Sequence, residues 1–141
     1  MAIGNEPAAL AEWILDQVSD ALIYADRAGN IVRWNQASCT LFGYSAQEAL
    51  GASLDIIIPE HLRGPHWAGF HAAIDSGGTK LQGRPTLTRA AHKDGRKLYV
   101  EMTFALVTEP GGTAVGSVAM ARDVTERVEK ERAARKAASR P

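Results

Sequence analysis

Residues 56–78 read IIIPEHLRGPHWAGFHAAIDSGG, and the rest of the chain is arranged around this stretch. The apolar run at its start gives way to a helical pattern after the Gly-Pro pair at 64–65. A helix has about 3.6 residues per turn, so His66, Phe70 and Ile74 share one face, and this face points to the core. His66 is therefore either a satisfied core residue or a ligand to something held in that core.

The sequence before this stretch predicts a helix, a hairpin and two short helices. The turn between the strands contains a glycine, which is typical of hairpins. Asn35 is a good N-cap and Gly43 a good C-cap for one short helix, and Ser45 with Glu48 forms a capping box for the next. The predicted elements are a helix over 7–18, strands over 21–25 and 30–34, and helices over 36–42 and 45–51.

The sequence after this stretch predicts three strands and a last helix. A bent strand over 79–91 contains Pro85, which favours an edge position. The strand over 98–107 alternates, so one face carries Leu98, Val100, Met102, Phe104 and Leu106. The strand over 113–122 has small residues on one face, namely Ser117, Ala119 and Ala121. We expect Asp123 to cap a helix over 124–138.

This order predicts an α+β fold, with a five-stranded antiparallel sheet, short helices across one face, and a flanking helix at each end. We divide the chain into a flanking helix (1–18), a sensor domain (19–123) and a linker helix (124–141). The 141 residues carry 16 basic and 16 acidic side chains, which gives no indication of a nucleic-acid or polybasic membrane partner. One cysteine, no signal peptide and no apolar run long enough for a membrane span lead us to expect a soluble, cytoplasmic module.

Four segments together resemble a PAS domain of the S-box type: DRAGNIVRWNQA, FGYSAQEALG, HKDGR and RDVTERVEKER. The resemblance extends from about Trp13 to Arg127. It implies the PAS fold. It does not select a ligand, since PAS domains bind haem, flavin, small metabolites or nothing.

A narrower resemblance lies in IIIPEHLRGPHWAGF, which is similar to the haem-binding oxygen-sensor PAS domains of FixL-type histidine kinases. It places His66 at the proximal haem ligand, and Met102 and Phe104 at the distal wall. Thr86 takes the place of the arginine that hydrogen-bonds oxygen in that family, with Arg84 and Arg89 on either side. Gly69, Ala72 and Lys80 stand where that family holds the haem propionates. The resemblance thus supports haem binding more than oxygen sensing.

The residues themselves supply what a five-coordinate haem requires: a neutral imidazole, an apolar wall, and cations for the propionates. Met102 is either a sixth axial ligand or a soft gap-filler of the wall. We expect Trp67 to be a packing residue, and His71 and His92 to be solvated. The candidates for binding the haem propionates are His61, Lys80, Arg84 and Arg89. The candidate haem b site comprises His66 as iron ligand with Phe70, Ile74, Lys80, Arg84, Thr86, Val100, Met102, Phe104 and Ala119.

The sequence leaves two main functions open, and they belong to different classes of protein. The first is a haem-based sensor of a diatomic gas or of redox state. The second is a cofactor-free PAS module for dimerisation or metabolite binding, with a flavin-bound redox domain third; Cys39 lacks the sequence context of a light-sensing flavin–cysteine domain. No nucleophile elbow, phosphate loop or kinase signature occurs, so we do not expect an enzyme. We expect a homodimer through the flanking helices and a C-terminal effector such as a histidine kinase.

Overall fold

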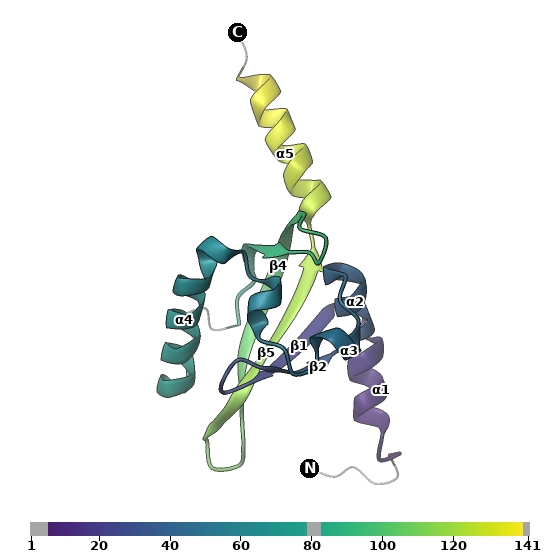
Figure 1. The fold of residues 1–141 in the computed structure, drawn as a ribbon, viewed down its shortest axis with the longest axis vertical. Coiled ribbons are helices and arrows are strands. Elements are labelled where there is room, and N and C mark those ends of the chain that lie inside the picture. Colours follow the sequence, from purple (N-terminus) through teal and green to yellow (C-terminus); the bar gives the residue numbers. More distant parts are fainter. Residues whose placement is uncertain (1–5, 79–82, 140–141) are drawn as a thin grey trace.

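A computed structural model describes residues 6–78 and 83–139 as one antiparallel sheet with helices around it (Figure 1). The elements are α1 (Leu10–Gln17), β1 (Ala21–Asp26), β2 (Ile31–Trp34), α2 (Gln36–Phe42), α3 (Ala46–Ala49), the 3₁₀ helices η1 (Leu54–Ile57) and η2 (Glu60–Leu62), α4 (Arg63–Ser76), β3 (Thr86–Ala91), β4 (Lys97–Thr108), β5 (Ala114–Asp123) and α5 (Thr125–Ala138). The predicted α+β class and the antiparallel sheet are confirmed.

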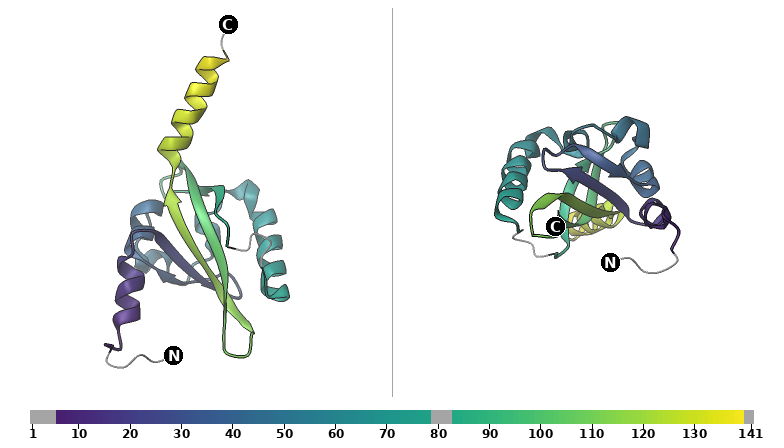
Figure 2. Two further views of the ribbon diagram at one scale, coloured as in Figure 1. Left: turned by 180° about the vertical axis from the view of Figure 1, so that it is seen from behind. Right: turned by 90° about the horizontal axis from the view of Figure 1, so that it is seen from below.

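Within the described residues the sheet has five strands in the order β2-β1-β5-β4-β3, so its first and last strands along the chain pair at the centre. Helices α2, α3 and α4 lie along the sheet, whereas α5 continues away from it toward the C-terminus (Figures 1 and 2). The β1–β2 turn forms because the Asp26 carboxylate accepts the backbone N–H groups of Ala28 and Asn30, each at 3.0 Å. Gly29 closes the turn at φ +84°, a conformation that favours glycine.

Local capping interactions fix where the two short helices after the hairpin begin and where the first of them ends, as predicted. The Asn35 side chain accepts the Ser38 N–H at the start of α2, and Gly43 ends that helix in the left-handed conformation at φ +83°. Ser45 and Glu48 form the reciprocal capping box of α3.

Strand register brings the predicted apolar positions onto one face of the sheet. In β4, Met102 lies opposite Ala121 and Phe104 opposite Ala119 of β5, and Met102 also lies opposite Thr86 of β3. Directly opposite residues point to the same face. Leu98 and Val100 are buried there, while Met102, Phe104 and Leu106 pack against the same core.

Three boundaries differ from the predicted ones. Helix α4 begins at Arg63 and not after Pro65, because a proline in the first turn forfeits only an N–H that has no helical partner. The strand predicted over 79–91 begins only at Thr86, and residues 79–82 lie outside the described part. The last helix begins at Thr125, although the Asp123 carboxylate does accept the Thr125 N–H at 2.9 Å.

The expectation that His92 is solvated is wrong. Its side chain is only 12 % exposed, and a methyl group at Gly43 would lie 2.4 Å from its ring. The reason is tertiary: the Lys93 N–H donates to the Phe42 carbonyl at 2.9 Å, which fixes the β3–β4 turn on the end of α2. Pro85 does precede an edge strand, since β3 is the last strand of the sheet. Among the described residues, no helix has the length and apolar character needed to cross a membrane.

Candidate functional site

His66 lies in the first half of α4, and its side chain is partly buried. Its ring centroid is 6.0 Å from that of Phe70, nearly parallel to it, and 4.8 Å from that of Trp67, edge to face. Phe70 and Ile74 on the same helix face are buried. The Nδ1 atom of His66 is closed to solvent and has no hydrogen-bond partner among the described residues. Since buried polar atoms are nearly always paired, this unpaired nitrogen marks His66 as a candidate for binding a ligand.

The protonation state of His66 also suits a role as a metal ligand. Burial lowers the pKa of His66 below its ordinary value, the negative charge of Asp55 partly opposes this, and His71 lowers the pKa further. The imidazole is therefore held in the neutral form at neutral pH, the form in which histidine donates an electron pair to a metal.

The sheet supplies an apolar wall from three strands. Val100 is completely buried in the core, and Met102 and Phe104 pack against it. Thr86 and Ala119 share the face of this wall by register. Phe70 and Ile74 of α4 belong to the same cluster. The structure therefore brings seven of the ten predicted residues into one region, with His66 beside Phe70.

The predicted cations do not all lie at this wall. Lys80 falls outside the described residues, and Arg84 is exposed. Arg89 lies opposite Tyr99 in the β3–β4 pair, so it alternates to the face away from Thr86 and Thr88. Arg89 thus points away from the wall, contrary to its place among the propionate candidates. His61 is exposed on η2.

Trp67, Asp55 and Gly29 form a second layer behind His66 that the sequence analysis missed. The Trp67 indole N–H donates to the Asp55 carboxylate at 2.7 Å, and the ring lies directly over Gly29. Trp67 is a packing residue as expected, but its partners come from distant parts of the chain. No local pattern indicates them.

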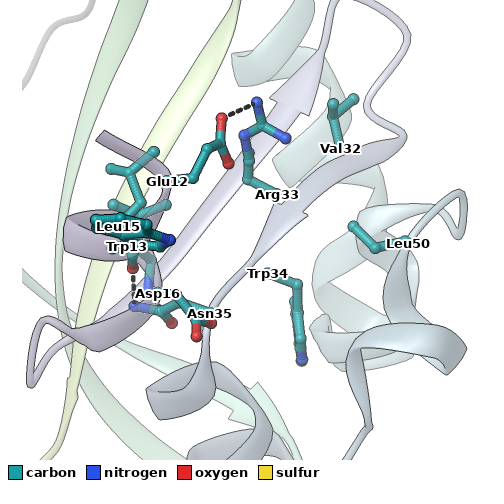
Figure 3. Close-up of a pocket in the computed structure, with 10 residues that line it drawn as sticks. Glu12, Trp13, Leu15, Asp16, Val32, Arg33, Trp34, Asn35 and Leu50 are labelled. Atoms are coloured by element: carbon teal, nitrogen blue, oxygen red, sulfur yellow. Dashed lines mark hydrogen bonds and ion pairs between the residues drawn. The ribbon is translucent and has the colours of Figure 1, made fainter. Parts of the chain in front are cut away.

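Two open cavities lie away from His66. One, of about 330 Å³, lies between α1 and β2, where the Glu12–Arg33 ion pair of 2.7 Å crosses from helix to strand (Figure 3). The other, of about 370 Å³, lies beside Asp20 and Arg122. Neither is lined by a residue of α4. Over the described ranges, no three histidine, cysteine or acidic side chains gather as metal ligands.

The PAS fold family matches residues 15–129. The chain belongs to the PAS family. This PAS domain is 33 % identical over 123 residues to an uncharacterized protein of Azorhizobium caulinodans, covering 85 % of the chain and 16 % of the relative. It is 25 % identical over 118 residues to the oxygen sensor protein DosP of Escherichia coli, covering 83 % and 14 %. The chain thus spans only a small part of these curated relatives.

Solved structures agree with the PAS assignment. The PAS domain of a Colwellia psychrerythraea protein superposes with a TM-score of 0.71 at 26 % identity, covering 82 % of this chain and 95 % of that one. An RNA-binding light-oxygen-voltage receptor gives a TM-score of 0.71 at 27 % identity over 99 % of this chain and 40 % of its own. A PAS domain of a two-component sensor histidine kinase shares the fold, with a TM-score of 0.62 at 18 % identity over 80 % of this chain and 92 % of that one. The expected PAS domain is confirmed by these matches.

Proposed function

We propose that this PAS domain is a non-enzymatic sensor that binds haem b through His66. The observation that supports this most is the buried Nδ1 of a neutral imidazole on the helix face of Phe70 and Ile74, which has no hydrogen-bond partner in the described part of the chain. The donor type, its protonation and the apolar surroundings fit haem. When bound, haem supplies an iron centre that takes up diatomic gases and changes oxidation state.

Each group of residues has a distinct task in this proposal. His66 supplies the iron ligand from α4. Val100, Phe104 and Ala119 present an apolar surface from the sheet and exclude water. Arg84, together with Lys80 from outside the described residues, is the candidate for the propionates. Met102 belongs to the same wall and is either a gap-filler or a second axial ligand.

The wall favours carbon monoxide or nitric oxide over oxygen. Oxygen acquires negative charge on binding and carbon monoxide little, so hydrogen-bond donors near the gas decide between them. Thr86, opposite Met102, offers one hydroxyl and no cation. Arg89 lies on the other face. Relatives of this chain include an oxygen sensor, DosP, so we propose gas sensing with weak oxygen affinity.

A second function, a cofactor-free module, is favoured by the packing itself. Phe70 and Ile74 already belong to one cluster with Leu98 and Val100, so a planar cofactor would replace contacts within that cluster. A flavin domain is a third candidate, since a light-oxygen-voltage receptor is 27 % identical. In each case we propose a homodimer through α1 and α5, and an effector such as a histidine kinase beyond α5.

Haem uptake separates these functions. We expect the purified domain to bind added haemin, which gives an intense Soret absorption band. In the reduced protein, carbon monoxide should shift this band. His66→Ala should lose the band while keeping its circular dichroism spectrum. His71→Ala is the matched control, because His71 is exposed on the same helix. A colourless wild type that also fails to take up haemin refutes the proposal in favour of the cofactor-free module.

The absorption spectrum of the reduced, gas-free protein tests the role of Met102. Conversion from a six- to a five-coordinate spectrum in Met102→Leu identifies the thioether as a ligand, and identical five-coordinate spectra leave Met102 in the wall. Tight, slowly dissociating oxygen in the wild type would contradict the weak-oxygen part of the proposal.

A further inference from the structure

The contact between Trp67 and Gly29 joins α4 to the β1–β2 turn. A methyl group in place of a Gly29 hydrogen would lie 2.1 Å from one carbon of the Trp67 ring and 2.2 Å from another. No real side chain tolerates such distances, so the indole occupies the space that any larger residue at position 29 would need. Gly29 is itself buried. The indole is therefore held against backbone, a surface that cannot move aside.

The other edge of the indole is held by Asp55. The indole N–H donates to the carboxylate at 2.7 Å, and Asp55 is in turn fixed by Arg63, whose guanidinium donates to the Asp55 carbonyl at 3.2 Å. The segment that carries Asp55 is bonded to the same turn, since the Leu54 N–H donates to the Gly29 carbonyl at 3.0 Å. Gly29 and Asp55 thus form one platform, and Trp67 is bound to both parts of it.

His66 precedes Trp67, so the rotation of α4 that seats the indole also sets the direction of the imidazole. The His66 ring contacts Trp67 at one edge and Phe70 at one face. We propose that Trp67 is a positioning residue: seated between Gly29 and Asp55, it holds the His66 imidazole toward the sheet and closes Nδ1 to water. The effect of this positioning on haem binding rests on the proposed function. The positioning of His66 by Trp67 is itself a property of the cofactor-free protein.

Two glycines provide a matched test. Gly29 and Gly51 have nearly the same backbone conformation, φ +84° and φ +87°, but a methyl group at Gly51 meets no atom of the described residues within 4 Å. Gly29→Ala and Gly51→Ala therefore impose similar backbone strain, and only Gly29→Ala displaces the indole. Trp67→Leu removes the indole directly, and Trp67→Phe keeps an aromatic ring over Gly29 without the hydrogen bond to Asp55.

The readout is the position of the His66 ring in the cofactor-free protein, followed by NMR through the contacts between its ring protons and those of Phe70. In the wild type the two ring centroids are 6.0 Å apart, and the Trp67 indole touches the His66 ring at its edge. Displacing the indole removes this edge contact, so the imidazole loses the group that fixes its direction. We expect the contacts between His66 and Phe70 to weaken in Gly29→Ala and Trp67→Leu, less in Trp67→Phe, and not in Gly51→Ala.

Unchanged contacts between His66 and Phe70 in folded Trp67→Leu, or an equal loss of these contacts in Gly29→Ala and Gly51→Ala, would overturn the positioning role. Should Trp67→Leu fail to fold, the comparison of the two glycine variants gives the answer. Haemin titration adds a second readout. We expect Gly29→Ala to weaken haemin binding about 10- to 100-fold relative to Gly51→Ala, the usual effect of groups that orient a metal ligand. If wild type takes up no haemin, the proposed function fails, while the NMR result still decides the positioning.

Discussion

Asn35 shows how one buried polar side chain ties three elements together. Its Oδ1 accepts the N–H groups of Leu22 and Ser38, at 2.9 and 3.0 Å, and the Ser38 hydroxyl at 3.0 Å. Its Nδ2 donates to the carbonyls of Leu15 and Asp20, at 2.9 and 3.0 Å. The side chain is only 3 % exposed. Asn35 therefore joins α1, β1 and the start of α2 in addition to its role as N-cap.

We predict that Asn35→Ala lowers the free energy of unfolding by about 3 kcal/mol, because it removes a helix cap and leaves buried backbone groups without partners. Urea denaturation measures this. Ser45→Ala is the control: it removes a cap that is exposed, at a cost of about 1 kcal/mol. Similar losses in the two variants would contradict the view that burial, and not capping alone, makes Asn35 important.

His66 predicts a pH dependence of stability in the cofactor-free protein. Burial lowers its pKa in the folded state, so the unfolded state binds the proton more readily. The contribution of His66 to stability is complete above its ordinary pKa and is lost as the pH falls below that value. We expect His66→Leu to reduce the acid-side slope of unfolding free energy against pH, measured by urea denaturation across this range. His61→Leu, which removes an exposed histidine, should keep the wild-type slope; a slope that persists in His66→Leu would refute the assignment.

At the scale of elements, β4 connects the core to the exit helix. Its inner face carries Val100 and Met102, and its outer face carries Tyr99. The Tyr99 carbonyl accepts the Val124 N–H at 2.9 Å, and the Tyr99 N–H donates to the Thr125 hydroxyl at 2.9 Å. Farther along α5, the Arg132 guanidinium lies 4.8 Å from the Tyr99 ring centroid. Tyr99 therefore links β4 both to the start of α5 and to its middle.

We predict that Thr125→Val loosens the first turn of α5, because the Tyr99 N–H loses its acceptor, at a local cost of about 1–2 kcal/mol. Amide hydrogen exchange in α5 should become faster, while exchange in β5 stays as in wild type. Thr40→Val is the control, since its hydroxyl donates only within α2, to the Gln36 carbonyl at 3.3 Å. Unchanged protection of α5 in Thr125→Val would show that Val128, which is buried, holds the helix alone.

At the scale of the whole molecule, α1 leaves apolar surface exposed beside β2. Trp13 is 51 % exposed and Ile14 52 %, and Val32 and Leu50 lie on the same cavity as Trp13 (Figure 3). Several exposed large apolar residues in one place are typical of an interaction surface. This supports the proposed homodimer through the flanking helices.

We predict that Trp13→Glu weakens self-association at least about tenfold, because a charge then replaces apolar contact area at the interface. Sedimentation equilibrium measures the association constant. Leu87→Glu is the matched control, since Leu87 is 54 % exposed on β3 at the far edge of the sheet. A wild type that stays monomeric, or a Leu87→Glu variant that dissociates as readily, would contradict the proposed interface.

The sequence by itself determined the features that depend on near neighbours. Caps at Asn35 and Ser45 each satisfy the N–H group three residues ahead, so their partners are visible in the local pattern. The alternation along β4 follows from the period of a strand, and it correctly placed Met102 and Phe104 on the core face. The same reasoning from helix period put His66 on the face of Phe70. These are the parts of the candidate site that were predictable.

Only the tertiary structure decided which distant groups meet. The pairing of β1 with β5 joins the two ends of the domain, and strand register places Arg89 on the face away from the wall. The seat of Trp67 on Gly29 and the packing of His92 against Gly43 are likewise contacts between segments that are distant in the sequence. The early start of α4 was missed because a proline is compatible with a first helical turn as well as with a break. Contacts across long stretches of chain depend on register and packing summed over the whole sheet, and no short pattern carries that information.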